Sequence, residues 1–286
     1  MENREIEYFD NLWNESHPKD GMKHTRETWD RLAEGWNDDP AEVRKQKDKQ
    51  CDDVTEFFVE RGILTKDSEV VDIGCGAGTY AVRFAQKAKS VTCTDISPKM
   101  LDICKKTADE AGISNVKCIE CDFLEYDASA WADRFDLVFT SLTPAMSGAK
   151  SVEKVNGISR GWCFNNSFVY RKDNIRNAVM KDVFGKEPTN KWGNSSVYCL
   201  FNILWHMGFL PELKYYKEII EYDYDLTYDF AKAVVVNIIR DRAPTDEEVK
   251  RTLDYLERNM SADGKIKKVT ESLYGWTLWN VKEGRA

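Results

Sequence analysis

A glycine-rich segment in the first third of the chain constrains the fold more than any other feature. A short apolar run, Glu69–Ile73, leads directly into Gly74-Cys75-Gly76-Ala77-Gly78. Apolar residues then recur at helical spacing between Ala81 and Ala88. Glycine allows a sharp turn between a strand and a helix, and it lets a ligand approach the backbone without a Cβ in the way. The segment therefore predicts a strand, a ligand-binding turn and a helix in succession.

The alternation of short strands and helices continues along the next seventy residues. Ser97 and Pro98 are typical of a helix start, as N-cap and first helical residue, and Gly112 is typical of a helix end. This rhythm indicates a parallel sheet with helices on both faces and with the ligand at the edge where the strands end. The predicted strands are Glu69–Ile73, Ser90–Thr94, Asn115–Glu120 and Phe135–Ser141.

The flanking segments are predicted to be mainly helical. Apolar residues from Trp29 to Trp36 form one stripe at helical spacing, and a second helix is expected to begin with Asp39 as N-cap and Pro40 in its first position. Beyond Pro144 we expect strands at Trp162–Phe168, Lys214–Tyr224 and Leu273–Val281. We also expect helices at Asn174–Phe184, Ser195–Met207, Tyr228–Arg240 and Thr245–Asn259, the last opened by a capping box.

The charge balance disfavours a nucleic-acid partner. The chain has 41 Lys and Arg against 49 Asp and Glu, a net charge of −8, whereas a phosphate backbone attracts clustered cations. No apolar run approaches the about 20 residues that cross a bilayer, and no secretory signal is visible. We therefore expect no membrane or nucleic-acid partner, a cytoplasmic location, and a monomer or homodimer.

The eight cysteines are expected to be free thiols in a reducing compartment. Cys118 and Cys121 have a metal-like spacing, but no second pair and no histidine lies nearby. They also fall in a predicted strand, where such a pair would point to opposite faces. The sequence therefore predicts no metal site.

Carboxylates follow the second and third predicted strands. Asp95 ends the second strand, where it can accept hydrogen bonds from both hydroxyls of a ribose. Asp122 follows the third, where it can accept from an adenine amine while Phe123 packs on the ring. The glycine spacing differs from that of nicotinamide sites, which would place the last small residue at Thr79, because the third glycine here is Gly78.

With these residues in place, the sequence resembles the class I S-adenosylmethionine-dependent methyltransferases, especially the group acting on small molecules. The matching segments lie between Glu69 and Pro144, and Trp29–Trp36 is similar to the helix that often precedes this core and closes over the cofactor. The resemblance implies S-adenosyl-L-methionine as cofactor and S-adenosyl-L-homocysteine as product. The implied cofactor site consists of Trp36, Asp72, Gly74, Gly76, Gly78, Asp95, Ile96, Asp122, Phe123 and Ser141, with the three glycines and Asp72 around the methionine part.

The predicted fold class is α/β, a Rossmann-like, doubly wound, mostly parallel seven-stranded sheet. Residues 1–65 are expected to form an N-terminal helical lid, and residues 66–225 the cofactor-binding core. Residues 226–264 would form a helical insertion that caps the substrate site, and residues 265–286 the strand that completes the sheet.

The predicted reaction is an in-line displacement in which a nucleophile is held about 3 Å from the sulfonium methyl, so no catalytic side chain is named. Candidate acceptor contacts are Thr143, Tyr224, Tyr228 and His206, although each also fits a packing or turn role. Two alternatives remain: a nicotinamide-dependent oxidoreductase of related fold, and a non-catalytic protein that binds the cofactor. The position of Gly78 and the lack of a Tyr-x-x-x-Lys-like pair near the fourth strand count against the oxidoreductase.

Overall fold

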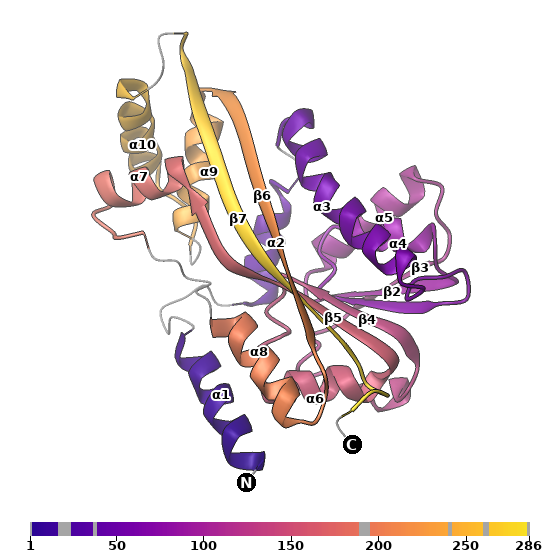
Figure 1. The fold of residues 1–286 in the computed structure, drawn as a ribbon. Coiled ribbons are helices and arrows are strands. Elements are labelled where there is room, and N and C mark those ends of the chain that lie inside the picture. Colours follow the sequence, from indigo (N-terminus) through magenta and orange to yellow (C-terminus); the bar gives the residue numbers. More distant parts are fainter. Residues whose placement is uncertain are drawn as a thin grey trace.

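A seven-stranded sheet organises the molecule in the computed structural model, which describes residues 2–16, 24–36, 39–188, 195–239, 242–259 and 263–284. The strand order is β3-β2-β1-β4-β5-β7-β6 (Figure 1). Strands β1 to β5 run parallel to one another, whereas β7 is antiparallel to both β5 and β6. The predicted α/β, Rossmann-like, mostly parallel seven-stranded sheet is confirmed. The strands are β1 (Glu69–Ile73), β2 (Ser90–Asp95), β3 (Val116–Glu120), β4 (Phe135–Ser141), β5 (Ser159–Asp173), β6 (Glu212–Asp225) and β7 (Lys265–Asn280).

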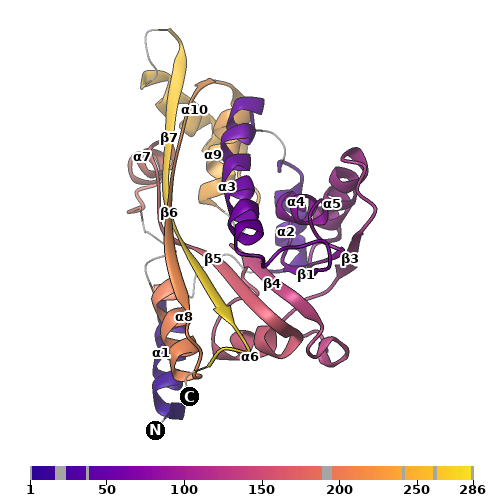
Figure 2. The same ribbon diagram turned by 45° about the vertical axis from the view of Figure 1, so that its right-hand side comes forward.

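Helices cover both faces of the central strands. Because side chains alternate between the faces of a strand, Val70 packs with the core beneath α3 and α4, and Val71 packs with the core beneath α6 and α8. Figures 1 and 2 show these two helical layers on opposite sides of the sheet. The helices are α1 (Glu2–Ser16), α2 (Arg26–Ala33), α3 (Ala41–Glu60), α4 (Thr79–Ala85), α5 (Pro98–Glu110), α6 (Ala149–Ile158), α7 (Asn174–Asp182), α8 (Ser195–His206), α9 (Tyr228–Ile238) and α10 (Asp246–Arg258). Among these described helices, none is both long enough and apolar enough to span a bilayer.

The three C-terminal strands extend well beyond the rest of the sheet. The pairing of β4 with β5 ends at Ser141 and Asn166, but β5 continues alongside β7 to Asp173, and β6 pairs with β7 as far as Asp225. Helices α7, α9 and α10 pack on this extension around a separate apolar core that includes Val235. We call residues 167–182, 215–238, 246–258 and 265–275 the arm; it projects from one end of the sheet in both views (Figures 1 and 2).

Most local signals in the sequence correspond to real helix ends. Ser97 caps α5 by accepting a hydrogen bond from the Met100 N–H, with Pro98 in the first turn, and the capping box at the start of α10 is formed. The predicted N-cap role of Asp39 is wrong. Pro40 occupies that position in α3 without a side-chain cap, because the Asp39 carboxylate instead pairs with the ammonium of Lys47.

The C-terminal helices and strands lie where they were predicted, with different ends. Helix α9 ends at Ile238, and the predicted end at Arg240 lies outside the described residues. Helix α6 was not predicted. Strands β5 and β7 are much longer than the sequence patterns indicated, because their additional residues pair with each other in the arm.

Candidate functional site

Three successive strand ends meet at one edge of the sheet and are joined by backbone hydrogen bonds. The N–H groups of Gly74 and Cys75 donate to the Thr94 carbonyl at 2.8 and 2.9 Å. The Cys121 N–H donates to the Asp95 carbonyl at 3.0 Å, which ties the loop after β3 to the end of β2. Because parallel strands end at the same edge, the glycine loop, Asp95 and Asp122 lie side by side there as predicted.

The three loop glycines all have positive φ, at +69° for Gly74, +52° for Gly76 and +77° for Gly78. A Cβ on Gly74 would lie 2.1 Å from Thr143 Oγ1, and one on Gly78 would lie 2.4 Å from Cys104 Sγ. The protein's own packing therefore requires glycine at both positions. At Gly76 the nearest side chain is Trp36, with Cζ2 at 3.8 Å from the position of a Cβ, so the indole lies over the middle of the loop.

Asp95 holds the glycine loop and the start of α5 together. Its Oδ2 accepts from the Gly76 N–H and its Oδ1 from the Ser97 N–H, both at 2.9 Å. Burial raises the pKa of Asp95, while these backbone donors act in the opposite direction. A carboxylate offers about four lone-pair sites, so Asp95 keeps acceptor capacity for hydroxyl groups of a ligand. Ile96 is half-buried beside it.

Asp72 is a buried acid near the end of β1. Its side chain is 2% exposed, and its Oδ2 has no hydrogen-bond partner among the described residues. Burial raises the pKa of Asp72 well above the usual aspartate value. An unpartnered buried acceptor costs free energy unless a bound group supplies a donor, so this oxygen fits the ammonium of a methionine moiety.

Asp122 and Phe123 differ in their surroundings. Asp122 is exposed at the ligand edge, and its Oδ1 accepts from the Leu124 N–H at 3.0 Å. Phe123 is only 4% exposed and packs in the core, with the Lys154 ammonium 5.0 Å from its ring centroid. Its predicted stacking on an adenine ring stays a prediction.

The end of β4 carries a polar pair, of which the sequence indicated Ser141 but not its partner Asn166. Ser141 Oγ accepts from Asn166 Nδ2 at 3.0 Å, and the buried Asn166 Oδ1 has no partner among the described residues. Leu142, the next residue after Ser141, has a φ of +52°, which is uncommon for a non-glycine residue and often marks a functional turn. The signal for this pair was the polar Asn165-Asn166 step within an otherwise apolar strand.

The N-terminal segment covers this edge. Asp30 Oδ1 accepts from Ser97 Oγ at 2.5 Å, and Lys99 pairs with Glu34 at 2.7 Å, so α2 is fixed to the start of α5. Arg26 pairs with Glu120 at the end of β3 at 2.9 Å. Helix α2 and Trp36 therefore lie beside the ends of β2 and β3. That residues 1–65 act as a lid stays a prediction.

The four candidate acceptor residues are not gathered at one point. Thr143 packs directly on Gly74. Tyr224, in the arm, donates from its hydroxyl to Asp39 Oδ1 at 3.4 Å, at the junction of the arm with the N-terminal segment. Tyr228 is exposed and donates to Asp246 within the arm at 2.8 Å. His206 stacks on Phe9 at 5.8 Å, where α8 leads into β6 at the edge at which the parallel strands begin.

The family comparison matches residues 64–191 to a methyltransferase domain. Two solved structures share the fold. A protein of Bacillus halodurans C-125 assigned to the methyltransferases has a TM-score of 0.51 at 16% identity, covering 78% of this chain and 97% of that one. The YcgJ protein of Bacillus subtilis has a TM-score of 0.52 at 15% identity, covering 81% and 98%. At these identities the likeness is one of fold.

Curated relatives match over shorter segments. The 23S rRNA (uracil(1939)-C(5))-methyltransferase RlmD of Francisella tularensis is 27% identical over 105 residues, which is 35% of this chain and 23% of that protein. The ubiquinone biosynthesis O-methyltransferase of Coxiella burnetii is 30% identical over 82 residues, which is 28% and 33%. The chain thus matches a third or less of the length of these relatives.

Proposed function

Because residues 64–191 form a methyltransferase domain of the class I S-adenosylmethionine-dependent family, we propose that this protein transfers a methyl group from S-adenosylmethionine to a small-molecule acceptor. S-adenosylmethionine is the methyl donor of that family, in agreement with the cofactor predicted from the sequence. A nicotinamide-dependent reaction is not favoured, since both the glycine spacing and the family match count against it.

The cofactor assignment rests on two acids beside the glycine loop, the buried Asp72 and the half-buried Asp95. Asp72 presents an unpartnered carboxylate oxygen, and Asp95 retains acceptor capacity next to Gly76. These acids suit an ammonium and a ribose diol respectively, and both favour a cationic ligand electrostatically. The exposed Asp122 offers a further acceptor at the same edge, where we expect the adenine.

The cofactor supplies an electrophilic sulfonium methyl when bound. The chain's own residues have to hold an acceptor in line and keep water away, which is catalysis by proximity and orientation. We assign the orienting role to Thr143, which lies on Gly74, and to the neighbouring Ser141 and Asn166. Trp36 and α2 would exclude water from above the loop.

A small acceptor is supported by the charge pattern of the arm. Four of its lysines are paired with carboxylates across β6 and β7 or on β5, and exposed pairs of this kind add little net positive field for a phosphate backbone. The pairs are Lys217–Glu271 at 2.9 Å, Lys267–Glu221 at 3.0 Å, Lys265–Asp225 at 3.3 Å and Lys268–Asp173 at 3.4 Å. The net charge of −8 acts in the same direction.

We place the acceptor between the N-terminal segment and the arm, which approach each other at Tyr224 and Asp39. The contacts of Tyr228 and His206 give no support for a role of either residue at the acceptor. We also propose a cytoplasmic monomer or homodimer, because all eight cysteines are free thiols, as in a reducing compartment.

Calorimetric titration tests the cofactor assignment. We expect S-adenosylmethionine, but not NAD, to bind the wild-type chain, and Asp95→Ala to weaken that binding at least about 100-fold through the loss of charge-assisted hydrogen bonds. Asp102→Ala, on the exposed face of α5, is the matched control and should bind normally. A wild-type chain that fails to bind the sulfonium, or an Asp95→Ala variant that binds it equally well, would contradict the proposal.

A turnover assay tests the acceptor class. Release of S-adenosylhomocysteine is followed with pooled amine, hydroxyl and thiol compounds in one arm and with ribosomal RNA in the other. We expect turnover with members of the small-molecule pools. Turnover with RNA alone would overturn the small-molecule assignment, and cofactor binding without turnover of any acceptor would favour the non-catalytic alternative.

A further inference from the structure

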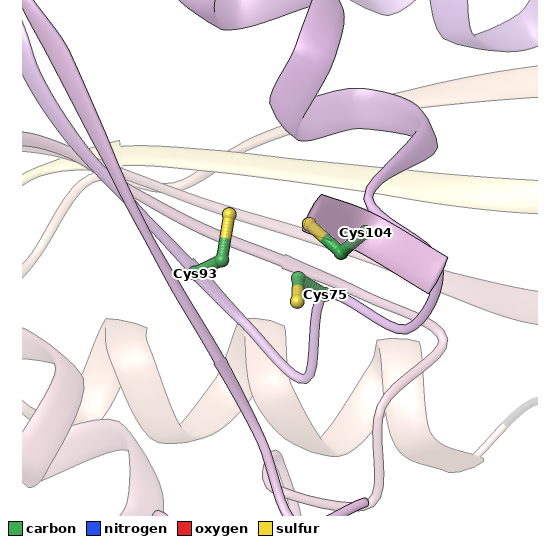
Figure 3. A group of neighbouring side chains, drawn as sticks. All are labelled: Cys75, Cys93 and Cys104. Atoms are coloured by element: carbon green, nitrogen blue, oxygen red, sulfur yellow. The ribbon is translucent and has the colours of Figure 1, made fainter. Parts of the chain in front are cut away.

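Four cysteines from four different parts of the fold meet directly beneath the glycine loop. Cys75 lies in the loop, Cys93 in β2, Cys104 in α5 and Cys118 in β3. The Sγ atoms of the first three all lie within 4.8 Å of one another, and Figure 3 shows the three side chains as neighbours. The Sγ of Cys118 lies 3.8 Å from that of Cys104. We call these four residues the thiol cluster.

The sulfurs of Cys75, Cys93 and Cys104 lie close to the spacing found around a thiolate-bound cation, and the sulfur of Cys118 lies at that spacing from Cys104. Zinc takes four thiolates at about 2.3 Å in a tetrahedron, which separates the sulfurs by about 3.8 Å. An ion at the centre of a triangle with 4.8 Å edges would lie about 2.8 Å from each sulfur, so a contraction of about half an ångström per ligand gives the zinc distance. Cys104, which contacts the other three, is the centre of the arrangement.

Binding of a cation would also change the protonation of the cluster. A soft divalent cation would replace the protons of these thiols, which leave to solvent as each thiol becomes a ligand.

We propose that Cys75, Cys93, Cys104 and Cys118 bind one thiophilic divalent cation, with zinc as the chemical type. The inference rests on the geometry of the sulfurs and is independent of the proposed methyl transfer. The metal-like spacing of Cys118 and Cys121 in the sequence does not correspond to this cluster. Cys118 is a member of the cluster, whereas Cys121 is not. The four ligands come together only through the pairing of β1, β2 and β3 and the packing of α5 on them.

Such an ion would tie the cofactor loop to the sheet beneath it. Cys75 lies between Gly74 and Gly76, and Cys104 Sγ is the atom against which Gly78 packs. A bound cation would therefore link the loop to β2, β3 and α5 at one point. We expect zinc to raise the melting temperature of the chain, since an ion that binds only the folded state stabilises it.

Metal content of the purified full-length chain tests the proposal. After incubation with zinc and gel filtration, we expect about one zinc per chain by elemental mass spectrometry, in keeping with a single four-thiolate site. Cys93→Ser and Cys104→Ser should lose most of this zinc. Cys121→Ser is the matched control, because it is only three positions from Cys118 and should retain the metal. Titration with cadmium should give a thiolate charge-transfer absorption in the wild type and in Cys121→Ser only.

Several results would contradict the proposed metal site. Substoichiometric zinc and no cadmium band in the wild type would overturn the inference, and so would equal retention in the cluster variants and the control. A disulfide between Cys104 and Cys118, found by alkylation and mass spectrometry of the purified chain, would also overturn it. If Cys104→Ser does not fold, the partly exposed Cys118→Ser and the protection of wild-type thiols from alkylation by zinc decide the question. Cofactor binding is titrated separately, so its failure would not be confused with failure of the metal site.

Discussion

Strands β1 to β4 differ from the strands of the arm in length, direction and exposure to solvent. Strands β1 to β4 are short and parallel, and Val70, Val71 and Ile73 in β1 are all 0% exposed. Strand β6 in the arm is long and antiparallel to β7, and its Tyr215 and Ile219 are 58% and 52% exposed. In the first region every strand ends at the cofactor edge. In the second, the strands run past that edge and form a surface of their own.

We infer from this difference that cofactor binding and acceptor selection are carried out by separate regions of the molecule. The buried parallel region holds the glycine loop and the acids that suit the methyl donor, and it resembles the relatives in both sequence and fold. Most of the arm lies beyond residue 191, where the match to the methyltransferase domain ends, and we assign the choice of acceptor to it. If the separation is real, variants in the first region change cofactor affinity and variants in the arm change acceptor turnover.

The largest expected effect concerns Gly74. In Gly74→Ala, the new Cβ would overlap Thr143 Oγ1 at 2.1 Å, in addition to the cost of a positive φ. We expect a loss of about 2–4 kcal/mol in the free energy of unfolding, measured with urea, together with a loss of most cofactor affinity. Gly62→Ala is the matched control, because Gly62 has a φ of +67° but nothing within 4 Å of its Cβ position. It should lose only about 1 kcal/mol and keep its affinity. Equal losses in the two variants would mean that the clash with Thr143 is unimportant.

Asp72→Asn is expected to raise the stability of the chain while weakening cofactor binding. Burial raises the pKa of Asp72, so the folded state binds a proton more tightly than the unfolded chain does. The stability of the wild type therefore falls as the pH rises above the ordinary aspartate range, because the unfolded chain ionises this group freely whereas the folded chain holds it protonated up to its raised pKa. We expect Asp72→Asn to melt several degrees higher than the wild type at pH 7 in the absence of cofactor, because Asn has no buried carboxyl with this pH-dependent cost. The difference should shrink as the pH is lowered, and cofactor affinity should drop about tenfold or more. A variant that melts lower than the wild type at pH 7 would show that Asp72 has a stabilising partner.

A smaller effect, confined to acceptor turnover, is expected for Tyr224→Phe in the arm. Tyr224→Phe removes the hydroxyl that reaches Asp39, a contact at 3.4 Å, and leaves the ring on Phe230. We expect about a fivefold loss in kcat/KM for the acceptor, equivalent to about 1 kcal/mol, with the Kd for the cofactor unchanged. Tyr228→Phe, whose hydroxyl bonds to Asp246 within the same arm, should change neither quantity. A rise in the cofactor Kd of Tyr224→Phe would contradict the separation of tasks.

The smallest effect is expected for Lys267→Ala. Its ammonium pairs with Glu221 at 3.0 Å on the exposed surface of the arm, and exposed pairs contribute little. The melting temperature should change by no more than about 1 °C and small-molecule turnover should not change at all. A clear decrease in RNA binding in this variant, measured against salt concentration, would instead point to a nucleic-acid acceptor.

The same two regions differ in how well the sequence predicted them. Strands β1 and β4 have the predicted ends, because their apolar runs are local signals and Gly74 directly follows β1. Strand β5 extends to Asp173 rather than Phe168, because its additional residues are stabilised by pairing with β7 about a hundred positions away. For the same reason, the glycine loop and Asp95 could be found in the sequence, while Asn166 and the thiol cluster could not. Their partners are supplied by neighbouring strands and by α5.

Helix α6 escaped prediction for a related reason. Gly148 precedes it and offers no side-chain cap. The cap comes from α1, where Asp10 Oδ1 accepts a hydrogen bond from the Ala149 N–H at 2.6 Å. An acceptor 139 residues away replaces the local Ser, Thr or Asp that normally marks a helix start.

The docking of α1 also has a consequence for biosynthesis. Trp13 is 1% exposed in the folded chain, in a core shared with Leu200 of α8, and Asp10 caps α6. Helix α1 leaves the ribosome well before α8, which emerges roughly 180 residues later; at about 5–20 residues per second this is some 10–40 seconds of translation. During that time the apolar face of α1 lacks its partner in α8. The nascent chain therefore carries an exposed apolar helix that chaperones can recognise.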